Sequence, residues 1–211
     1  YSKEIEFQWM PGLSIAQKKR SIANMHQAIY GKSLEISTKS EEELGFKLSA
    51  FNLRLQGVPV ENIFQSSKVF QQGGPYVDLL EVSAREAKRD ERLRNSGKLV
   101  AFEYDGQRWE LYPKTAFYDY LYVKAVKESL TKEDIETIAE YDAVRESFST
   151  DELMSLVEYD YFTDIEFNHK KSINTQARTV ALIKLMLIDY GTIPKLTSSE
   201  FIKYHRCNVK A

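Results

Sequence analysis

The chain has 211 residues, of which 43% are hydrophobic and 28% are charged, and its formal net charge is −2 at pH 7. These values are typical of a globular protein and exclude a disordered, fibrous or membrane-spanning chain. With 29 basic and 31 acidic residues, the chain has no overall positive field, so a nucleic-acid ligand would need a local basic patch. The single cysteine and the absence of a signal-peptide pattern favour the cytoplasm, with no membrane partner.

The spacing of apolar residues predicts a mostly helical chain. Helices are expected over residues 14–30, 60–70, 84–95, 115–128, 132–147, 150–158 and 174–190. Residues 34–38 alternate like a short strand, and residues 99–111 predict a hairpin with an Asp-Gly turn. We therefore expect an α+β fold, predominantly helical, with a small antiparallel sheet, and one domain over residues 1–211 with its motif-bearing core at 34–190.

The most informative motif lies in the helix expected over residues 60–70. Glu61, Phe64, Gln65 and Lys68 follow helical spacing and share one face. The commoner interpretation of such spacing is an exposed face with a Glu/Lys pair that contributes about 0.2–0.5 kcal/mol. The surrounding apolar residues leave only a narrow polar face, however, which is expected of a helix that lines a pocket.

A hydroxyl-rich loop contains Ser37, Thr38 and Lys39 and leads into a segment with Phe51 and Asn52. Such loops can hold a phosphate. An ordinary connection is the commoner interpretation, because neither the Walker glycine spacing nor a dinucleotide-binding fingerprint is present.

A second polar loop precedes the apolar helix expected over residues 174–190. It contains Lys170 and Lys171, and the first turn near Asn174 would present free backbone N–H groups. This segment has two interpretations that are about equally supported: a site that binds an anion, and an ordinary solvated helix N-terminus with capping residues.

The helix expected over residues 84–95 carries Arg85, Lys88, Arg89 and Arg92 on one side. Acidic residues are interleaved with these cations, so a solvated helix is the commoner interpretation and a surface for DNA phosphates is the alternative. The three histidines lie far apart without cysteine neighbours at ligand spacing, so no metal site is predicted.

Together these segments resemble the NADAR (YbiA-like) family. The run from Glu61 to Lys68 is similar to the family's Glu-x-x-Phe-Gln-x-x-Lys helix, and Ser37-Thr38 with Gly45 and Phe51 is similar to its Ser-Thr and Gly-x-Phe-Ser-Asn-Phe segments. Asn174 corresponds to the closing Gly-x-Asn-x-Leu-Gly stretch. The chain departs from the family at two positions, where Ala50 replaces Asn and Ala177 replaces Gly. Its form looks most like the NADAR antitoxins that accompany DarT toxins.

This resemblance implies an N-glycosidase, an ADP-ribosyl hydrolase that removes ADP-ribose from guanine bases in DNA. It implies ADP-ribose as product, a DarT-type toxin encoded in the same operon, and no cofactor. Such cleavage passes through a cation-like anomeric carbon and needs an acid for the leaving base, for which we choose Glu61. Lys68 would act electrostatically or form a Schiff base with the ring-opened sugar, with Lys39 and Lys88 as rival amines.

Under this interpretation Lys170, Lys171 and the N–H groups near Asn174 would hold the pyrophosphate, and Phe51 or Tyr76 would stack on a base. The expected substrate-binding residues are Ser37, Thr38, Lys39, Phe51, Asn52, Gln65, Tyr76, Lys170, Lys171 and Asn174. DNA phosphates would contact Arg85, Lys88, Arg89 and Arg92. Two alternatives stay open: a non-catalytic module that binds ADP-ribose or a nucleotide, and an N-glycosidase that acts on a riboflavin-pathway intermediate.

Overall fold

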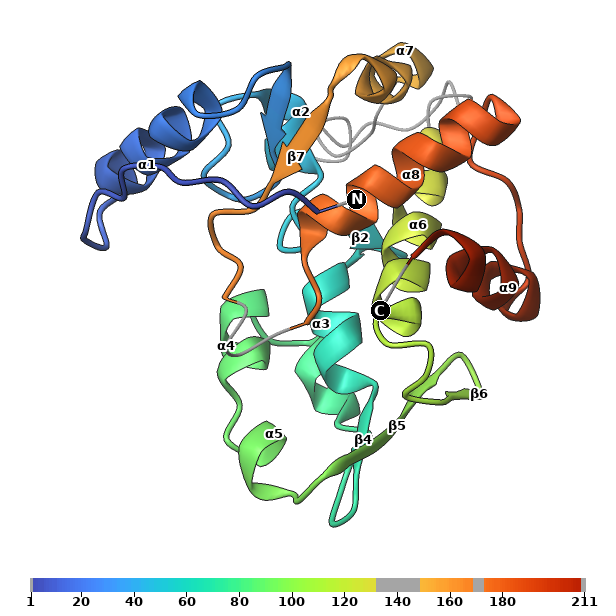
Figure 1. Ribbon diagram of the computed structural model, residues 1–211. Coiled ribbons are helices and arrows are strands. Elements are labelled where there is room, and N and C mark those ends of the chain that lie inside the picture. The colour runs from blue at the N-terminus through green and yellow to red at the C-terminus, as the bar shows by residue number, and fades with distance from the viewer. Residues whose placement is uncertain (1, 132–148, 169–172, 210–211) are drawn as a thin grey trace, which may run out of the picture. The chain divides into compact units, whose positions relative to one another are not determined.

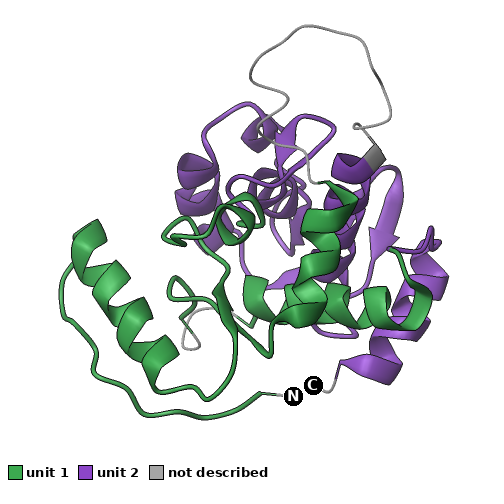
Figure 2. Ribbon diagram, turned by 90° about the horizontal axis from the view of Figure 1, so that it is seen from above, with its two compact units in different colours: residues 1–49, 149–192 green, residues 50–148, 193–211 purple. Residues whose placement is uncertain are grey.

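A computed structural model describes residues 2–131, 149–168 and 173–209. The chain forms two compact units, shown in green and purple in Figure 2. Unit 1 comprises Tyr1–Ser49 and Ser149–Thr192, and unit 2 comprises Ala50–Phe148 and Ile193–Ala211. The helix expected over residues 132–147 lies outside the described residues, as do Lys170 and Lys171. One domain over residues 1–211 stays a prediction.

Unit 1 is built from helices around a two-stranded sheet (Figure 1). Its elements are α1 (Ile15–Gln27), β1 (Ser33–Glu35), α2 (Glu43–Lys47), α7 (Thr150–Met154), the 3-10 helix η3 (Ser155–Glu158), β7 (Tyr161–Thr163) and α8 (Gln176–Tyr190). The side chain of Ser14 accepts from the N–H of Gln17 and begins α1 at the expected place. Strands β1 and β7 run parallel, with Leu34 opposite Phe162.

A close approach in unit 1 explains why a glycine stands at position 45. A Cβ atom there would lie 2.0 Å from the carbonyl oxygen of Glu35 and 2.5 Å from Oγ of Ser40. Only a residue without a side chain allows α2 to lie this close to β1. The parallel pairing of β1 with β7 was not predicted, because three-residue strands are too short to show an alternating pattern.

Unit 2 contains a small antiparallel sheet and most of the remaining helices (Figure 1). Its elements are β2 (Arg54–Leu55), β3 (Val58–Pro59), α3 (Val60–Ser66), β4 (Lys68–Phe70), the 3-10 helix η1 (Val77–Leu80), α4 (Ala84–Arg89), α5 (Arg92–Asn95), β5 (Leu99–Tyr104), β6 (Gln107–Trp109), α6 (Ala116–Thr131) and α9 (Ser198–Asn208). The three-stranded sheet has the order β4-β5-β6. The expected hairpin is confirmed, and Asp105 and Gly106 form its turn with φ of 53° and 70°.

An aromatic cluster forms much of the core of unit 2. The ring of Phe64 lies 5.4 Å from that of Phe102 and 5.1 Å from that of Tyr118, measured between ring centroids. Phe117 from α6 stacks on Phe102 at 4.6 Å. Every residue of α3 is buried, which confirms that this helix is not a solvated surface element. The packing surrounds the polar side chains of α3 with apolar material.

Two of the expected helices have different bounds in the structure. The helix expected over residues 60–70 ends at Ser66, and Lys68 begins β4, because residues 68–70 pair with β5. The helix expected over residues 84–95 is broken at Asp90, whose backbone is extended at φ −53° and ψ 129°. The carboxylate of Asp90 accepts at 2.9 Å from the N–H of Arg92, the first residue of α5. The α+β class, mostly helical with a small antiparallel sheet, is confirmed.

Candidate functional site

A carboxylate, an amide and an amine form a hydrogen-bonded row in unit 2. Glu61 and Gln65 are one turn apart on α3, and each is only 5% exposed. Nε2 of Gln65 donates to Oε1 of Glu61 at 2.8 Å, and Nζ of Lys68 donates to Oε1 of Gln65 at 2.6 Å. The three side chains expected to converge therefore do so. We call Glu61, Gln65 and Lys68 the polar row.

The local chain path places this row. The N–H of Glu61 donates to the carbonyl of Ala50 at 3.0 Å, which ties the first turn of α3 to the preceding segment. At the other end, the N–H of Glu103 donates to the carbonyl of Ser67 at 2.8 Å. The chain thus passes from helix to strand between Ser66 and Lys68. Lys68 stays beside Gln65 although it no longer belongs to the helix.

The environment of Lys68 makes its ammonium group easier to deprotonate than that of an ordinary lysine. Burial lowers its pKa to about 8, although Glu61 raises that pKa, and Lys88 contributes a smaller lowering. Its ammonium group lies 4.7 Å from the ring centroid of Phe64, part of the aromatic core. A substantial fraction of Lys68 is therefore unprotonated at mildly alkaline pH, and the neutral form of an amine is the nucleophilic one.

A second ammonium group reaches Glu61 from α4. Nζ of Lys88 lies 3.5 Å from Oε1 of Glu61 and 4.9 Å from the ring centroid of Phe51. The side chain of Lys88 is 53% exposed, whereas that of Glu61 is 6% exposed. Lys88, which the sequence placed among the DNA contacts, thus lies between solvent and the polar row.

Tyr76 and Arg92 form a separate contact on the same unit. The N–H of Tyr76 donates to the carbonyl of Ser66 at 2.8 Å, and its hydroxyl is hydrogen-bonded to Ser96. The guanidinium carbon of Arg92 lies 4.5 Å from the ring centroid of Tyr76. One face of this ring, expected to stack on a base, is therefore next to a guanidinium group.

Arg92 is also held by two carboxylates. Its Nη2 lies 2.6 Å from Oδ2 of Asp78 and 2.9 Å from Oδ2 of Asp90. These hydrogen bonds lower the pKa of both carboxyl groups. The expectation that Arg92 shares a continuous helical face with Arg85 is wrong, because the helix is broken at Asp90.

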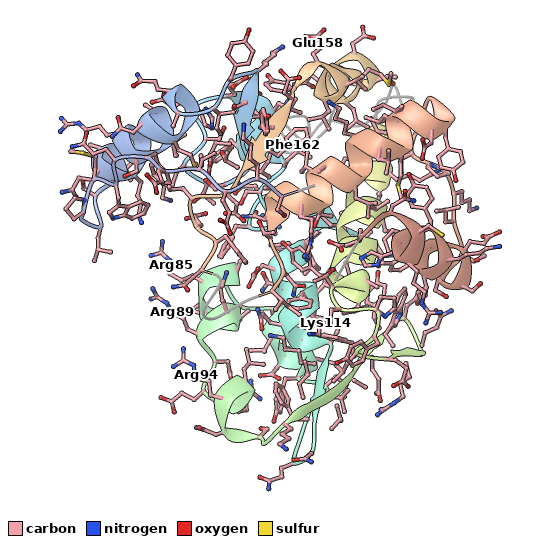
Figure 3. The ribbon with its side chains drawn as sticks, in the orientation of Figure 1. Arg85, Arg89, Arg94, Lys114, Glu158 and Phe162 are labelled. Carbon is pink, nitrogen blue, oxygen red and sulfur yellow. The ribbon has the colours of Figure 1, made fainter. Side chains whose placement is uncertain are left out.

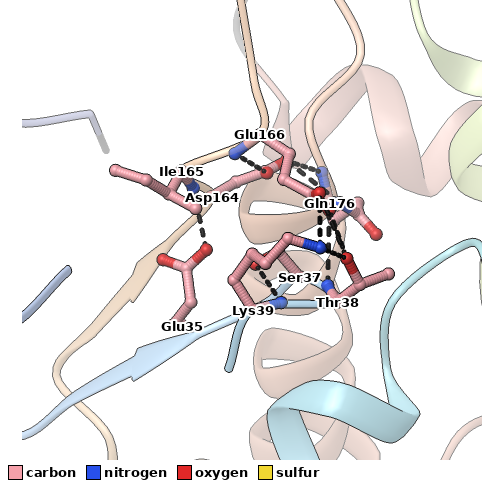
Figure 4. Close-up of polar contacts among 8 residues, drawn as sticks. All are labelled: Glu35, Ser37, Thr38, Lys39, Asp164, Ile165, Glu166 and Gln176. Carbon is pink, nitrogen blue, oxygen red and sulfur yellow. Dashed lines mark hydrogen bonds and ion pairs between the residues drawn. The ribbon is translucent and has the colours of Figure 1, made fainter. Parts of the chain in front are cut away.

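The hydroxyl-rich loop of unit 1 contacts a carboxylate (Figure 4). Oγ1 of Thr38 donates to Oε1 of Glu166 at 3.1 Å, and Nζ of Lys39 lies 3.5 Å from the same oxygen. Ser37 is fully buried, and its Oγ accepts from the N–H of Lys39 at 3.1 Å. Ser37, Thr38 and Lys39 are therefore brought together, around a residue that sequence reasoning did not single out.

Two carboxyl groups lie beside this loop, that of Glu35 buried and that of Asp164 half-buried (Figure 4). Glu35 accepts from Oγ1 of Thr163 at 2.5 Å and from the N–H of Ile165 at 2.8 Å, and burial raises its pKa. Oδ2 of Asp164 accepts from the first N–H of α8, at Gln176, at 3.2 Å. Burial, and after it the charge of Glu35, raise the pKa of Asp164 to about 6. No local pattern marks Glu35 or Asp164 in the sequence.

The expected site residues are divided between the two units. Those in unit 2 are Phe51, Asn52, Glu61, Gln65, Lys68, Tyr76, Arg85, Lys88, Arg89 and Arg92, and those described in unit 1 are Ser37, Thr38, Lys39 and Asn174. Within the described ranges no group of three or more His, Cys, Asp or Glu side chains is arranged to hold a metal ion.

Comparison with known families agrees with the motifs. The polar row, with a buried acid and amide and a half-buried amine, provides groups for acid–base and nucleophilic chemistry. The family model described as DarT1-associated NADAR antitoxin matches residues 1–210. The chain belongs to this family, so the resemblance is confirmed, and this membership supports an antitoxin role.

No curated protein matches the chain.

None of the helices in the described part of the chain has the length and apolarity needed to cross a bilayer.

Proposed function

We propose that this chain is an ADP-ribosyl glycohydrolase that removes ADP-ribose from guanine bases in DNA and so reverses the modification made by a DarT-type toxin. The observation that carries the proposal is the polar row, in which a buried carboxylate is joined through one amide to an amine whose pKa is about 8. Membership of a DarT1-associated antitoxin family supports the toxin partner and, through it, the modified base.

Glu61 is proposed as the general acid and base. Cleavage of the glycosidic bond needs a proton on the departing guanine and later the removal of a proton from water. Glu61 is held by Gln65 and approached by Lys88, so its carboxyl group has a defined orientation. Gln65 is a positioning residue in this scheme, because it acts through its neighbours.

Lys68 is proposed as the nucleophile in preference to Lys39 and Lys88. The amine adds to C1 of the ring-opened ribose, the bond between C1 and the guanine nitrogen breaks, and the guanine nitrogen takes up a proton. Water then hydrolyses the imine between Lys68 and C1, which releases ADP-ribose and restores the amine. The lowered pKa of Lys68 supports this route over a purely electrostatic role.

The other expected substrate contacts remain proposals. In unit 2 these are Phe51, Asn52 and Tyr76. In unit 1 they are Ser37, Thr38, Lys39 and Asn174, together with Lys170 and Lys171 outside the described residues. For the loop of unit 1, an anion would have to replace the carboxylate of Glu166 at Thr38 and Lys39.

The direct test is release of ADP-ribose from a single-stranded oligonucleotide ADP-ribosylated on guanine. We expect release by the wild type and a loss of at least about 100-fold in kcat for Glu61→Gln and for Lys68→Ala. Glu81→Gln and Lys98→Ala are matched controls at exposed positions of unit 2. Binding of the oligonucleotide or of free ADP-ribose by the wild type without release would support the non-catalytic module instead.

Borohydride trapping during turnover tests the covalent step. Reduction of the imine should leave ADP-ribose attached to the protein at Lys68, which peptide mass spectrometry would locate. Attachment at Lys39 or Lys88, or no attachment while release proceeds, would contradict a nucleophilic Lys68.

Release of the base from a riboflavin-pathway N-glycoside with no activity on modified DNA would favour the other enzymatic alternative.

A further inference from the structure

Three arginines on α4 and α5 point away from the rest of unit 2. Figure 3 shows Arg85, Arg89 and Arg94 on the outer side of the two short helices. All three side chains are exposed. Within the described residues, none of their three guanidinium groups makes a hydrogen bond or an ion pair. We call these residues the arginine ridge.

Most of the other charged side chains among residues 84–95 have a hydrogen-bond or ion-pair partner. Lys88 is directed to Glu61, and Arg92 is held by Asp78 and Asp90. The carboxylate of Glu86 accepts from the N–H of Ser83 in the capping box of α4. Among residues 84–95 this leaves three guanidinium groups and one exposed carboxylate, that of Glu91, without a partner.

The break at Asp90 is what brings Arg94 to the ridge. Arg85 and Arg89 are four positions apart on α4 and therefore share a face. In an unbroken helix Arg94 would lie about 180° around the axis from Arg85. Because the helix stops at Asp90 and begins again at Arg92, Arg94 lies on the same side as the other two (Figure 3).

We propose that the arginine ridge binds the phosphates of single-stranded DNA on one side of the modified nucleotide. This inference rests on the proposed function, and it replaces Lys88 and Arg92 as phosphate contacts by Arg94. Guanidinium groups bind phosphate oxygens in a bidentate manner and stay charged at any physiological pH. The ridge is a local positive surface on a chain of net charge −2.

Proximity to the polar row favours DNA over an acidic protein. Lys88 lies between Arg85 and Arg89 in the sequence of α4 and contacts Glu61 at 3.5 Å. A strand whose modified base is at Glu61 must therefore pass beside α4. An extruded or single-stranded base also requires that the flanking backbone be held, since base contacts alone do not fix it.

Salt dependence of binding gives a quantitative test. The probe is an unmodified single-stranded oligonucleotide, and Kd is measured over a range of salt concentrations. Each phosphate contact contributes about 0.7 to the slope of log Kd against log salt for single strands, so replacing all three arginines by alanine should lower the slope by about 2. Replacing them by lysine should keep most of the slope.

The matched control removes three other exposed cations of unit 2. Alanine replaces Lys195, Lys203 and Arg206, and the slope should fall by much less than for the ridge variant. Equal losses in the two triple variants would mean that only total charge matters, which overturns the ridge. An unchanged slope in the ridge variant would overturn it as well. Loss of binding to polyglutamate with unchanged DNA binding would assign the ridge to an acidic protein.

A kinetic comparison separates this inference from the proposed function. For the ridge variant, the ratio of kcat/KM on a modified oligonucleotide to kcat/KM on a modified mononucleotide should fall at least tenfold. A constant ratio with active wild-type protein would overturn the ridge alone. If the wild type releases no ADP-ribose but the ridge variant loses its salt slope, the proposed glycohydrolase fails and the ridge stands as a DNA contact.

Discussion

Nζ of Lys68 donates a 2.6 Å hydrogen bond to Oε1 of Gln65 across the point where α3 ends and β4 begins. This contact sets the orientation of the amide, because its oxygen faces the amine and its NH₂ group must face Glu61. The polar row therefore has a direction, with the amine as donor at one end and the carboxylate as acceptor at the other. A change at Gln65 should alter both ends.

Gln65→Glu should raise the pKa of Lys68. A carboxylate at hydrogen-bond distance favours the charged ammonium and typically moves a pKa by about 1–3 units. Since the neutral amine is the reactive form, the rise of kcat/KM with pH, expected near pH 8 in the wild type, should move upward by about one unit or more. The measurement is the pH–rate profile of ADP-ribose release, with Gln107→Glu as an exposed control. An unmoved profile would show that Lys68 is not the titrating group.

Asp164→Asn should remove part of the pH dependence of stability. The pKa of Asp164 is about 6 in the folded chain, above the ordinary value of 3.8 for an aspartate, so the folded state holds the proton more tightly than the unfolded state does. Stability from this group is therefore present below about pH 4 and is lost as the pH rises towards 6. Each unit of pKa difference corresponds to about 1.4 kcal/mol.

The variant should thus gain stability relative to the wild type between pH 4 and pH 7, by about 1–3 kcal/mol. Urea unfolding at the two pH values gives this difference, and Asp151→Asn at an exposed position is the control. A gain of the same size in both variants would contradict an effect specific to Asp164.

Asp119→Ala should destabilise the chain by about 1–3 kcal/mol, because it leaves the buried ring nitrogen of His205 without the carboxylate to which it is hydrogen-bonded. Nε2 of His205 on α9 lies 2.8 Å from Oδ2 of Asp119 on α6, and both side chains are 1% exposed. Thr115 donates to the same oxygen at 2.8 Å. In contrast, Arg108→Ala breaks the exposed pair with Glu103 and should cost less than about 1 kcal/mol. Urea unfolding at pH 7 compares the two, and similar losses would refute a structural role for the buried pair.

Gly45→Ala should destabilise the chain by about 1–3 kcal/mol or more, because a methyl group would meet the carbonyl oxygen of Glu35 at 2.0 Å. The double variant with Ser40→Ala removes the second obstacle, an Oγ at 2.5 Å, but leaves the backbone contact. It should therefore recover only part of the loss in the midpoint of thermal unfolding. Full recovery would place the clash at Ser40 alone.

Local sequence signals determined the parts of the fold that depend on neighbouring residues. Ser14 and Ser83 begin their helices through capping boxes, and Asp105-Gly106 forms the hairpin turn with positive φ. The apolar surroundings of Glu61 and Gln65 predicted a helix that is not solvated, and both residues are buried. These features follow from contacts within a few positions of the chain.

The tertiary structure decided the features that depend on distant segments. Lys68 belongs to a strand because β4 pairs with β5, which lies about thirty residues further on, and that pairing outweighs helical periodicity. Thr38 meets Glu166 only because β1 pairs with β7. Asp164 acquires its raised pKa from burial beside Glu35. The sequence thus determined which groups line the polar row, whereas long-range pairing and burial decided their distances, their charge states and their neighbours.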